Sequence, residues 1–90
     1  MRLFIQTVSA GLKLYSRPMC SWCVDAKNYL SDRGFQFTVV DVGRNSAAYE
    51  EMVRLSDQDC VPTLVAGDQV LANFDTAQLE KFLSDHGIKP

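Results

Sequence analysis

Apolar and polar residues change their spacing several times along the chain, and each change marks a different predicted element. Residues Leu12–Ser16 alternate in the manner of a half-buried strand, which Pro18 ends because proline cannot donate a backbone hydrogen bond. From Cys20, apolar residues recur at helical spacing until Gly34, which predicts about three helical turns with a glycine stop. The segment 35–42, rich in Phe, Thr and Val, is typical of a second strand.

A second helix and a β-hairpin are predicted next. Either Asn45 or Ser46 can cap the first turn of this helix. Residues 63–66 and 69–72 are two short apolar runs on either side of Gly67-Asp68. A two-residue turn of this kind joins antiparallel strands, because glycine readily adopts a positive φ angle. The apolar positions of the helix are Tyr49, Met52, Val53 and Leu55.

The last predicted element is a helix that Asp75 or Thr76 caps and that ends near Gly87. The complete order is then β-α-β-α-β-β-α, which predicts an α/β fold. The strand-helix-strand start implies a parallel pair with a right-handed crossover, and the hairpin adds an antiparallel pair. The expected architecture is a four-stranded mixed sheet flanked by helices.

The chain has the size and composition of a single folded domain. Ninety residues, 47% of them hydrophobic, suffice for one core and leave no room for a second. We assign residues 12–90 to this domain and interpret residues 1–11 as an N-terminal arm or an extra strand. We expect a monomer, with a dimer formed through the arm as the alternative.

Charge and cysteine content narrow the function further. A formal net charge of −2, with both signs interspersed, provides no basic surface for nucleic acid. The apolar runs are far shorter than the roughly 20 residues that cross a bilayer, so we expect no membrane partner. Three cysteines, two of them in a Cys-x-x-Cys motif, favour a reducing compartment and a cytoplasmic location over a secreted disulfide scaffold.

The candidate chemistry centres on Cys20-Ser21-Trp22-Cys23, at the predicted start of the first helix. This spacing puts both sulfurs on one side of the first turn, within reach of a disulfide bond. Cys20 faces the free N–H groups and the positive end of the helix dipole, which favour a thiolate, so we predict that it is the attacking thiol. Cys23 lies one turn deeper and is predicted to resolve the mixed disulfide.

Residues near this motif each have a functional and a structural interpretation. Arg17 can add positive charge near the thiolate or hold a substrate carboxylate, and it can equally be a solvated loop residue. Trp22 can cover Cys23 or offer an aromatic surface to partners, with core packing as the alternative. Tyr15 can reach the site from the first strand, but we interpret it as a packing residue.

A second candidate segment opens the third predicted strand at Val61-Pro62, a position that tolerates proline. Only about 5% of bonds before proline are cis, so the residues by themselves predict a trans bond. Cys60 precedes this pair. We interpret it as a buried thiol, the usual state of a lone cysteine, with a third redox or ligand sulfur as the alternative.

Taken together, Tyr15–Cys23 and Cys60–Leu64 resemble the glutaredoxins and the closely related redoxins that reduce ribonucleotide reductase. The resemblance extends over residues 12–85 and rests on a basic-Pro-x-Cys-x-x-Cys motif ahead of a Val-Pro. It implies the thioredoxin fold and a cis bond at Val61-Pro62, in place of the trans bond. It also implies a thiol-disulfide oxidoreductase that acts in cell redox homeostasis and electron transfer.

The resemblance also assigns roles to single residues. Cys20 becomes the nucleophile and Cys23 the resolving thiol, while the backbone of Val61 pairs with glutathione or a protein cysteine. Three departures matter: Ser21-Trp22 replaces the usual Pro-Tyr, Cys60 replaces a Thr, and both glycines of Gly-Gly-x-Asp-Asp are lost, which weakens the expected affinity for glutathione. The aligned segment is Ala72-Asn73-Phe74-Asp75-Thr76. The predicted residues for binding substrate or glutathione are Arg17, Trp22, Val61, Pro62, Asp75 and Thr76.

The resulting hypothesis is an enzyme that reduces protein disulfides or glutathione mixed disulfides. Glutathione or thioredoxin reductase resets it, and no organic cofactor is tightly bound. The alternative is a [2Fe–2S] carrier, in which Cys20 thiolates from two monomers and two glutathiones hold the cluster. We predict no other metal site, because a closed zinc site needs four ligands. The only side chains that could supply these four zinc ligands are those of Cys20, Cys23, Cys60 and His86.

Overall fold

A computed structural model of the chain describes residues 11–90 and places four strands in one sheet, in the order β2-β1-β3-β4. The central strand β1 (Leu12–Ser16) is parallel to β2 (Thr38–Asp41) and antiparallel to β3 (Thr63–Ala66). The edge strand β4 (Gln69–Ala72) pairs antiparallel with β3. The predicted mixed sheet and its hairpin are therefore confirmed.

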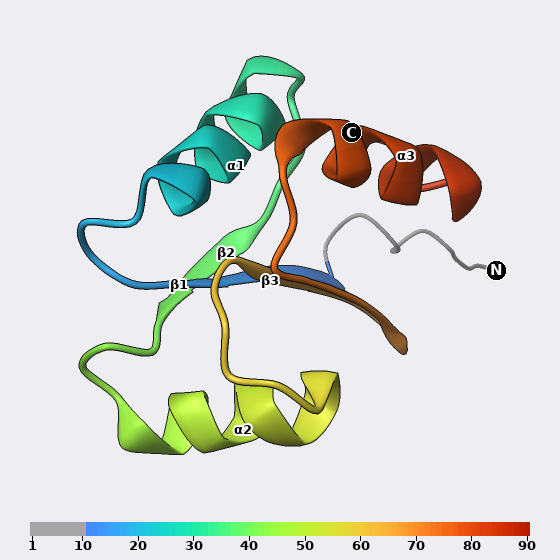
Figure 1. Cartoon of the computed structure of the whole chain (residues 1–90). Helices are drawn as coiled ribbons and strands as arrows, with labels where there is room; N and C mark the ends of the chain where they lie inside the picture. The colour runs from blue at the N-terminus through green and yellow to red at the C-terminus, as the bar shows by residue number, and fades with distance from the viewer. Residues whose placement is uncertain (1–10) are drawn as a thin grey trace, which may run out of the picture.

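Three helices cover the two faces of this sheet. Figure 1 shows α1 (Ser21–Asp32) and α3 (Thr76–Asp85) together on one face and α2 (Ser46–Ser56) on the other. The order of elements is the predicted one. In each helix a side chain caps the first turn by accepting the backbone N–H of the residue three positions further along. The capping residues are Cys20, Asn45 and Asp75.

Alternation along the central strands divides the core into two clusters, one on each face of the sheet. Leu14 and Leu64 belong to the cluster under α1 and α3, whereas Tyr15 and Val65 belong to the cluster under α2. Because both faces are buried, the sheet forms a firm platform for the loops at its ends. In the antiparallel pair of β1 and β3, Tyr15 lies opposite Thr63, so the loop after β1 and the loop before β3 meet the sheet at the same end of these strands.

The second strand is shorter than predicted. Instead of residues 35–42 it comprises only the four residues of β2. The Phe35 N–H donates to the Leu30 carbonyl at 3.0 Å, and Gly34 adopts a φ of 81°, so this stretch completes the end of α1. Phe35 and Phe37 are half-buried against the cluster under α1 and α3. Their apolar character therefore reflects core packing and not strand pairing.

Two other predictions concern the N-terminal arm and the absence of a membrane-crossing segment. The N-terminal arm, apart from Gly11, lies outside the described residues. Within residues 11–90, no helix has the length and apolar character that a membrane crossing requires.

Candidate active site

Cys20 is the N-cap of α1 and directly follows the loop that leaves β1. Its backbone is extended (φ −116°, ψ 108°), and its Sγ accepts a hydrogen bond from the Cys23 N–H at 3.2 Å. The same sulfur faces the positive end of the helix dipole. Cys20 is half-buried, and thus more exposed than Cys23. A partly exposed cysteine with an N–H donor to its sulfur at a helix start is suited to nucleophilic attack.

Cys23 lies on the inner side of α1 and is only 1% exposed. Burial raises the pKa of its thiol from the ordinary value of 9.0 to about 12, and the adjacent Cys20 side chain acts in the same direction. The backbone of Arg17 acts in the opposite direction, but its effect is smaller. At neutral pH the Cys23 thiol is therefore protonated. The two sulfurs differ in burial as expected, one accessible and one enclosed.

We expect the reduced protein to lose stability as the pH rises from the ordinary thiol value of 9.0 toward about 12. In this window the Cys23 thiol ionises in the unfolded chain but stays protonated in the folded chain, so deprotonation favours unfolding. Tyr15 contributes likewise, because burial and its hydrogen bond to Glu51 raise its pKa from 10.0 to about 12. Urea unfolding should show a shallower pH dependence for Cys23→Ala and for Tyr15→Phe. Identical slopes in all three proteins would contradict this origin.

A groove of about 520 Å³ opens beside the loop that leads to Cys20. We call it the active-site groove. It lies where α2 meets the β1–α1, α2–β3 and β4–α3 loops, and it includes two predicted site residues, Arg17 and Val61. Sequence reasoning did not assign Tyr49, Asp59 or Asn73 to the site. The full lining is Arg17, Tyr49, Asp59, Cys60, Val61 and Asn73.

The peptide bond between Val61 and Pro62 is cis, as the resemblance implied, and the trans bond predicted from base rates is wrong. Pro62 is fully buried at the start of β3. Its carbonyl accepts a hydrogen bond from the Asn73 N–H at 2.8 Å. This bond ties the β4–α3 loop to the segment that carries Val61.

Asn73 has a left-handed backbone, with a φ of 56°. It occupies the second glycine position of the family's Gly-Gly-x-Asp-Asp pattern, and asparagine is one of the few residues that tolerate this conformation. The loop therefore keeps the backbone shape that glycine permits. What changes is the side chain, because Asn73 is exposed and lines the groove where glycine would leave space. One signal in the sequence could have assigned Asn73 to the site: an asparagine stands where the family has a glycine.

Gln58 fixes the loop that presents Val61. Its side chain accepts the Cys60 N–H at 2.9 Å and donates to the Cys60 carbonyl at 3.2 Å. The Thr63 hydroxyl donates to the same carbonyl at 2.8 Å. With its backbone held inward, Cys60 turns its side chain to solvent, so the prediction of a buried thiol is wrong.

Trp22 and Tyr15 differ in burial. Trp22 is 47% exposed, so its interpretation as a core residue is wrong and an aromatic surface beside Cys20 fits its position. Met19 and Val24, close to Trp22 in the sequence, are also exposed. Tyr15 is fully buried and donates to Glu51 at 2.6 Å, which confirms its interpretation as a packing residue.

The two predicted residues at the start of α3 lie outside the lining of the active-site groove. The Asp75 carboxylate accepts the Gln78 N–H at 2.8 Å, and the Gln78 side chain accepts the Asp75 N–H at 2.9 Å. This capping box uses the carboxylate that was predicted to meet glutathione. Thr76 is the first residue of α3. Among residues 11–90, no three His, Cys, Asp or Glu side chains gather in a way that could hold a metal ion.

Comparison with known proteins agrees with this geometry. The family model described as Glutaredoxin matches residues 12–71. A curated relative, the uncharacterized glutaredoxin-like 8.6 kDa protein in the rubredoxin operon of Clostridium pasteurianum, is 33% identical over 72 residues, which cover 80% of this chain and 96% of the relative.

Two solved structures share the fold. The thioredoxin-like protein BC3987 is 28% identical with a TM-score of 0.74, covering 80% of this chain and 99% of its own. NrdH-redoxin from Escherichia coli, described as a glutaredoxin-like protein with a thioredoxin-like activity profile, is 27% identical with a TM-score of 0.66, covering 78% of this chain and 91% of its own. The predicted thioredoxin fold is thereby confirmed. The chain belongs to the glutaredoxin family, as a redox protein with the Cys20 and Cys23 pair.

Proposed function

We propose that this chain is a cytoplasmic dithiol enzyme that reduces protein disulfides and is reset by a thioredoxin reductase in preference to glutathione. The observation that carries the proposal is the pair of sulfurs at the start of α1. Cys20 is accessible and receives an N–H hydrogen bond, whereas Cys23 is enclosed one turn further along. A reducing compartment keeps such a pair in the dithiol state that the reaction requires.

The reaction proceeds in two exchanges. The Cys20 thiolate attacks one sulfur of the substrate disulfide, forms a mixed disulfide with it and releases the other sulfur as a thiolate, which takes up a proton. Cys23 then loses its proton and attacks Cys20 Sγ. This step forms the Cys20–Cys23 disulfide and releases the second substrate sulfur, which accepts the proton. The substrate gains two electrons and the enzyme loses two.

The raised pKa of Cys23 sets the order of these exchanges. Part of that rise comes from the adjacent Cys20 side chain. Once Cys20 is bound in the mixed disulfide its negative charge is gone, so this part of the barrier to ionising Cys23 disappears. Cys23 is thus inert in the free enzyme and becomes a better nucleophile when it is needed.

Two features, one in the active-site groove and one beside it at the start of α3, support a reductase over glutathione as the source of electrons. The Asn73 side chain occupies space that a family glycine leaves open, and the Asp75 carboxylate is engaged in capping α3. The first takes up space that glutathione would use, and the second commits one oxygen of the predicted glutathione-binding residue Asp75 to the cap. They also count against the cluster alternative, which needs two bound glutathiones. The thioredoxin-like activity profile given for the related NrdH-redoxin points the same way.

The test compares two recycling systems on one protein disulfide substrate. We expect thioredoxin reductase with NADPH to sustain turnover at least about tenfold faster than glutathione with glutathione reductase and NADPH. Turnover that is as fast with glutathione would overturn the proposed reset. Absence of turnover in both systems would overturn the dithiol reductase itself.

The matched variant is Asn73→Gly, which restores the family residue without straining the left-handed backbone. We expect it to raise the glutathione-dependent rate relative to the reductase-dependent rate. An unchanged ratio would mean that the Asn73 side chain does not restrict glutathione.

A further inference from the structure

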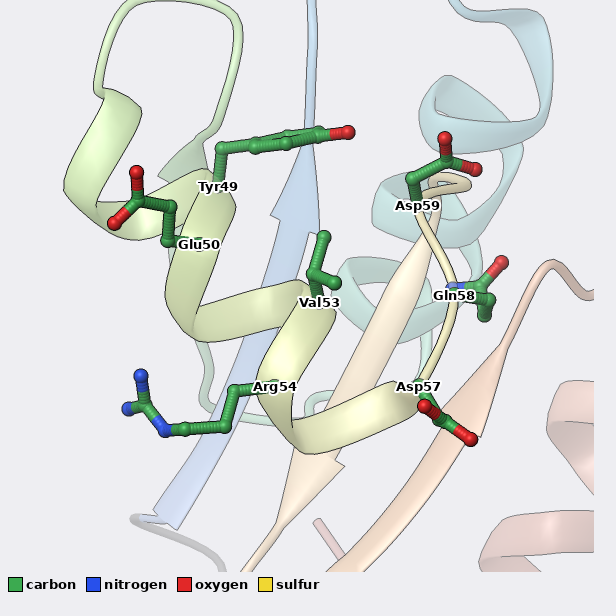
Figure 2. A pocket seen from close by; sticks show the side chains of 7 residues that line it. All are labelled: Tyr49, Glu50, Val53, Arg54, Asp57, Gln58 and Asp59. Atoms are coloured by element: carbon green, nitrogen blue, oxygen red, sulfur yellow. The ribbon is translucent and has the colours of Figure 1, made fainter.

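A second groove, of about 510 Å³, runs along α2 and the turn that follows it (Figure 2). We call it the α2 groove. Tyr49 and Asp59 line both this groove and the active-site groove, so the two share a wall. A substrate segment that leaves the active-site groove past these two residues therefore enters the α2 groove.

The floor of the α2 groove is apolar. Figure 2 shows Val53 between α2 and the segment that carries Gln58 and Asp59, with the Tyr49 ring extending toward the same side. Tyr49 and Val53 are both half-buried and pack against the outer edge of the cluster under α2. A half-buried aliphatic and aromatic surface of this kind suits an apolar side chain of a partner.

One wall of the α2 groove is acidic. Asp57 and Asp59 are exposed at the C-terminal end of α2, where the helix dipole is also negative. Within residues 11–90, neither of them forms an ion pair. Arg54 also lines the groove, but its side chain extends from the opposite side of α2, away from Asp57 and Asp59 (Figure 2). Asp57 even adopts a left-handed backbone, with a φ of 60°, where glycine or asparagine would be the usual residue.

We infer that the α2 groove docks a basic, extended segment of the protein substrate, with an apolar side chain over Val53 and a Lys or Arg beside Asp57 and Asp59. This inference rests on the proposed reduction of protein disulfides and names the substrate class. Glutathione carries two carboxylates and one ammonium group, so its net charge opposes the acidic wall. A polypeptide can instead span both grooves while its disulfide lies at Cys20.

The test uses three synthetic peptides, each with one cysteine in a mixed disulfide with β-mercaptoethanol. They differ only in the residues that flank the cysteine. These are Leu and Lys in the basic peptide, Leu and Gln in the neutral peptide, and Leu and Glu in the acidic peptide. We expect kcat/KM to be about three- to tenfold higher for the basic peptide than for the neutral one, mainly through KM. High ionic strength should shrink this preference.

Asp57→Asn is the first variant, because asparagine keeps the left-handed backbone and removes only the charge. We expect it to lower the ratio of basic to neutral kcat/KM by about two- to fourfold. Val53→Lys should abolish the preference for the basic peptide. Leu55→Lys is its control, since Leu55 is 44% exposed on the same helix and outside the groove lining. A preference that survives Asp57→Asn and Val53→Lys unchanged would overturn the inference.

A binding measurement separates the two proposals. The same peptides with serine in place of cysteine cannot react, so their affinities report docking alone. If all three disulfides are reduced equally and the serine peptides bind equally, docking in the α2 groove is wrong and the reductase stands. If no disulfide is reduced while the basic serine peptide binds best, the reductase fails and the docking site stands.

Discussion

Replacement of Cys20 by serine is expected to abolish disulfide reduction, with a loss of about 1000-fold or more, the scale seen when a covalent nucleophile is removed. The hydroxyl of serine does not ionise near neutral pH, so the helix start that stabilises a sulfur anion has no anion to stabilise. Turnover of a protein disulfide with thioredoxin reductase and NADPH measures the effect.

Cys23→Ser is the matched control for this loss. It leaves Cys20 in place, so the first exchange still occurs and a mixed disulfide accumulates that cannot be resolved. Intact-mass measurement after one addition of substrate should show the adduct on Cys23→Ser and none on Cys20→Ser. Reduction at the wild-type rate by Cys20→Ser would refute the assignment of the nucleophile.

The largest expected effect on stability comes from Phe74→Ala. Phe74 is 1% exposed in the cluster under α1 and α3, directly after Asn73 in the loop that is bonded to Pro62. Truncating a buried phenylalanine costs about 3–5 kcal/mol, a large share of the roughly 5–15 kcal/mol that holds a domain together. The urea midpoint of the reduced protein should fall accordingly.

Leu55→Ala provides the comparison, because Leu55 is 44% exposed on α2. We expect it to change the free energy of unfolding by no more than about 0.5 kcal/mol. Equal losses in Phe74→Ala and Leu55→Ala would mean that Phe74 does not anchor the core. Because the loop of Asn73 lines the active-site groove, Phe74→Ala should also weaken substrate binding well below the unfolding transition.

The features that sequence reasoning predicted well are those that local patterns determine. Gly34 ends the first helix, the hairpin turns at Gly67-Asp68, and Asp75 caps the last helix. The spacing of Cys20 and Cys23 depends only on residues a few positions apart. From these the order of elements follows, and with it the sheet. The prediction of a half-buried first strand is wrong, because helices cover both faces of the sheet and four of the five residues of β1 are buried.

What the sequence could not supply depends on particular hydrogen bonds that no pattern of apolar and polar residues reveals. Phe35 was assigned to a strand because its composition fits one, but its N–H completes the end of α1. Cys60 is predicted to be buried, yet its N–H donates to Gln58 and its carbonyl accepts from Thr63, which fixes its backbone and leaves its side chain exposed. Asn73 is placed in the site by the hydrogen bond from its N–H to the carbonyl of Pro62, eleven positions earlier in the chain. No local pattern encodes such a bond.

The pairing of Tyr15 with Thr63 has an evolutionary consequence. It holds the loop that leads to Cys20 and the loop that ends at Pro62 at the same end of the sheet. A slip of one residue would turn every side chain of a strand to the opposite face, so the register of the pairing tolerates little change. The loops carry no such constraint. We therefore expect descendants of this chain to acquire new partners by exchanging loop residues such as Cys60 and Asn73, while the strand pairing is inherited intact.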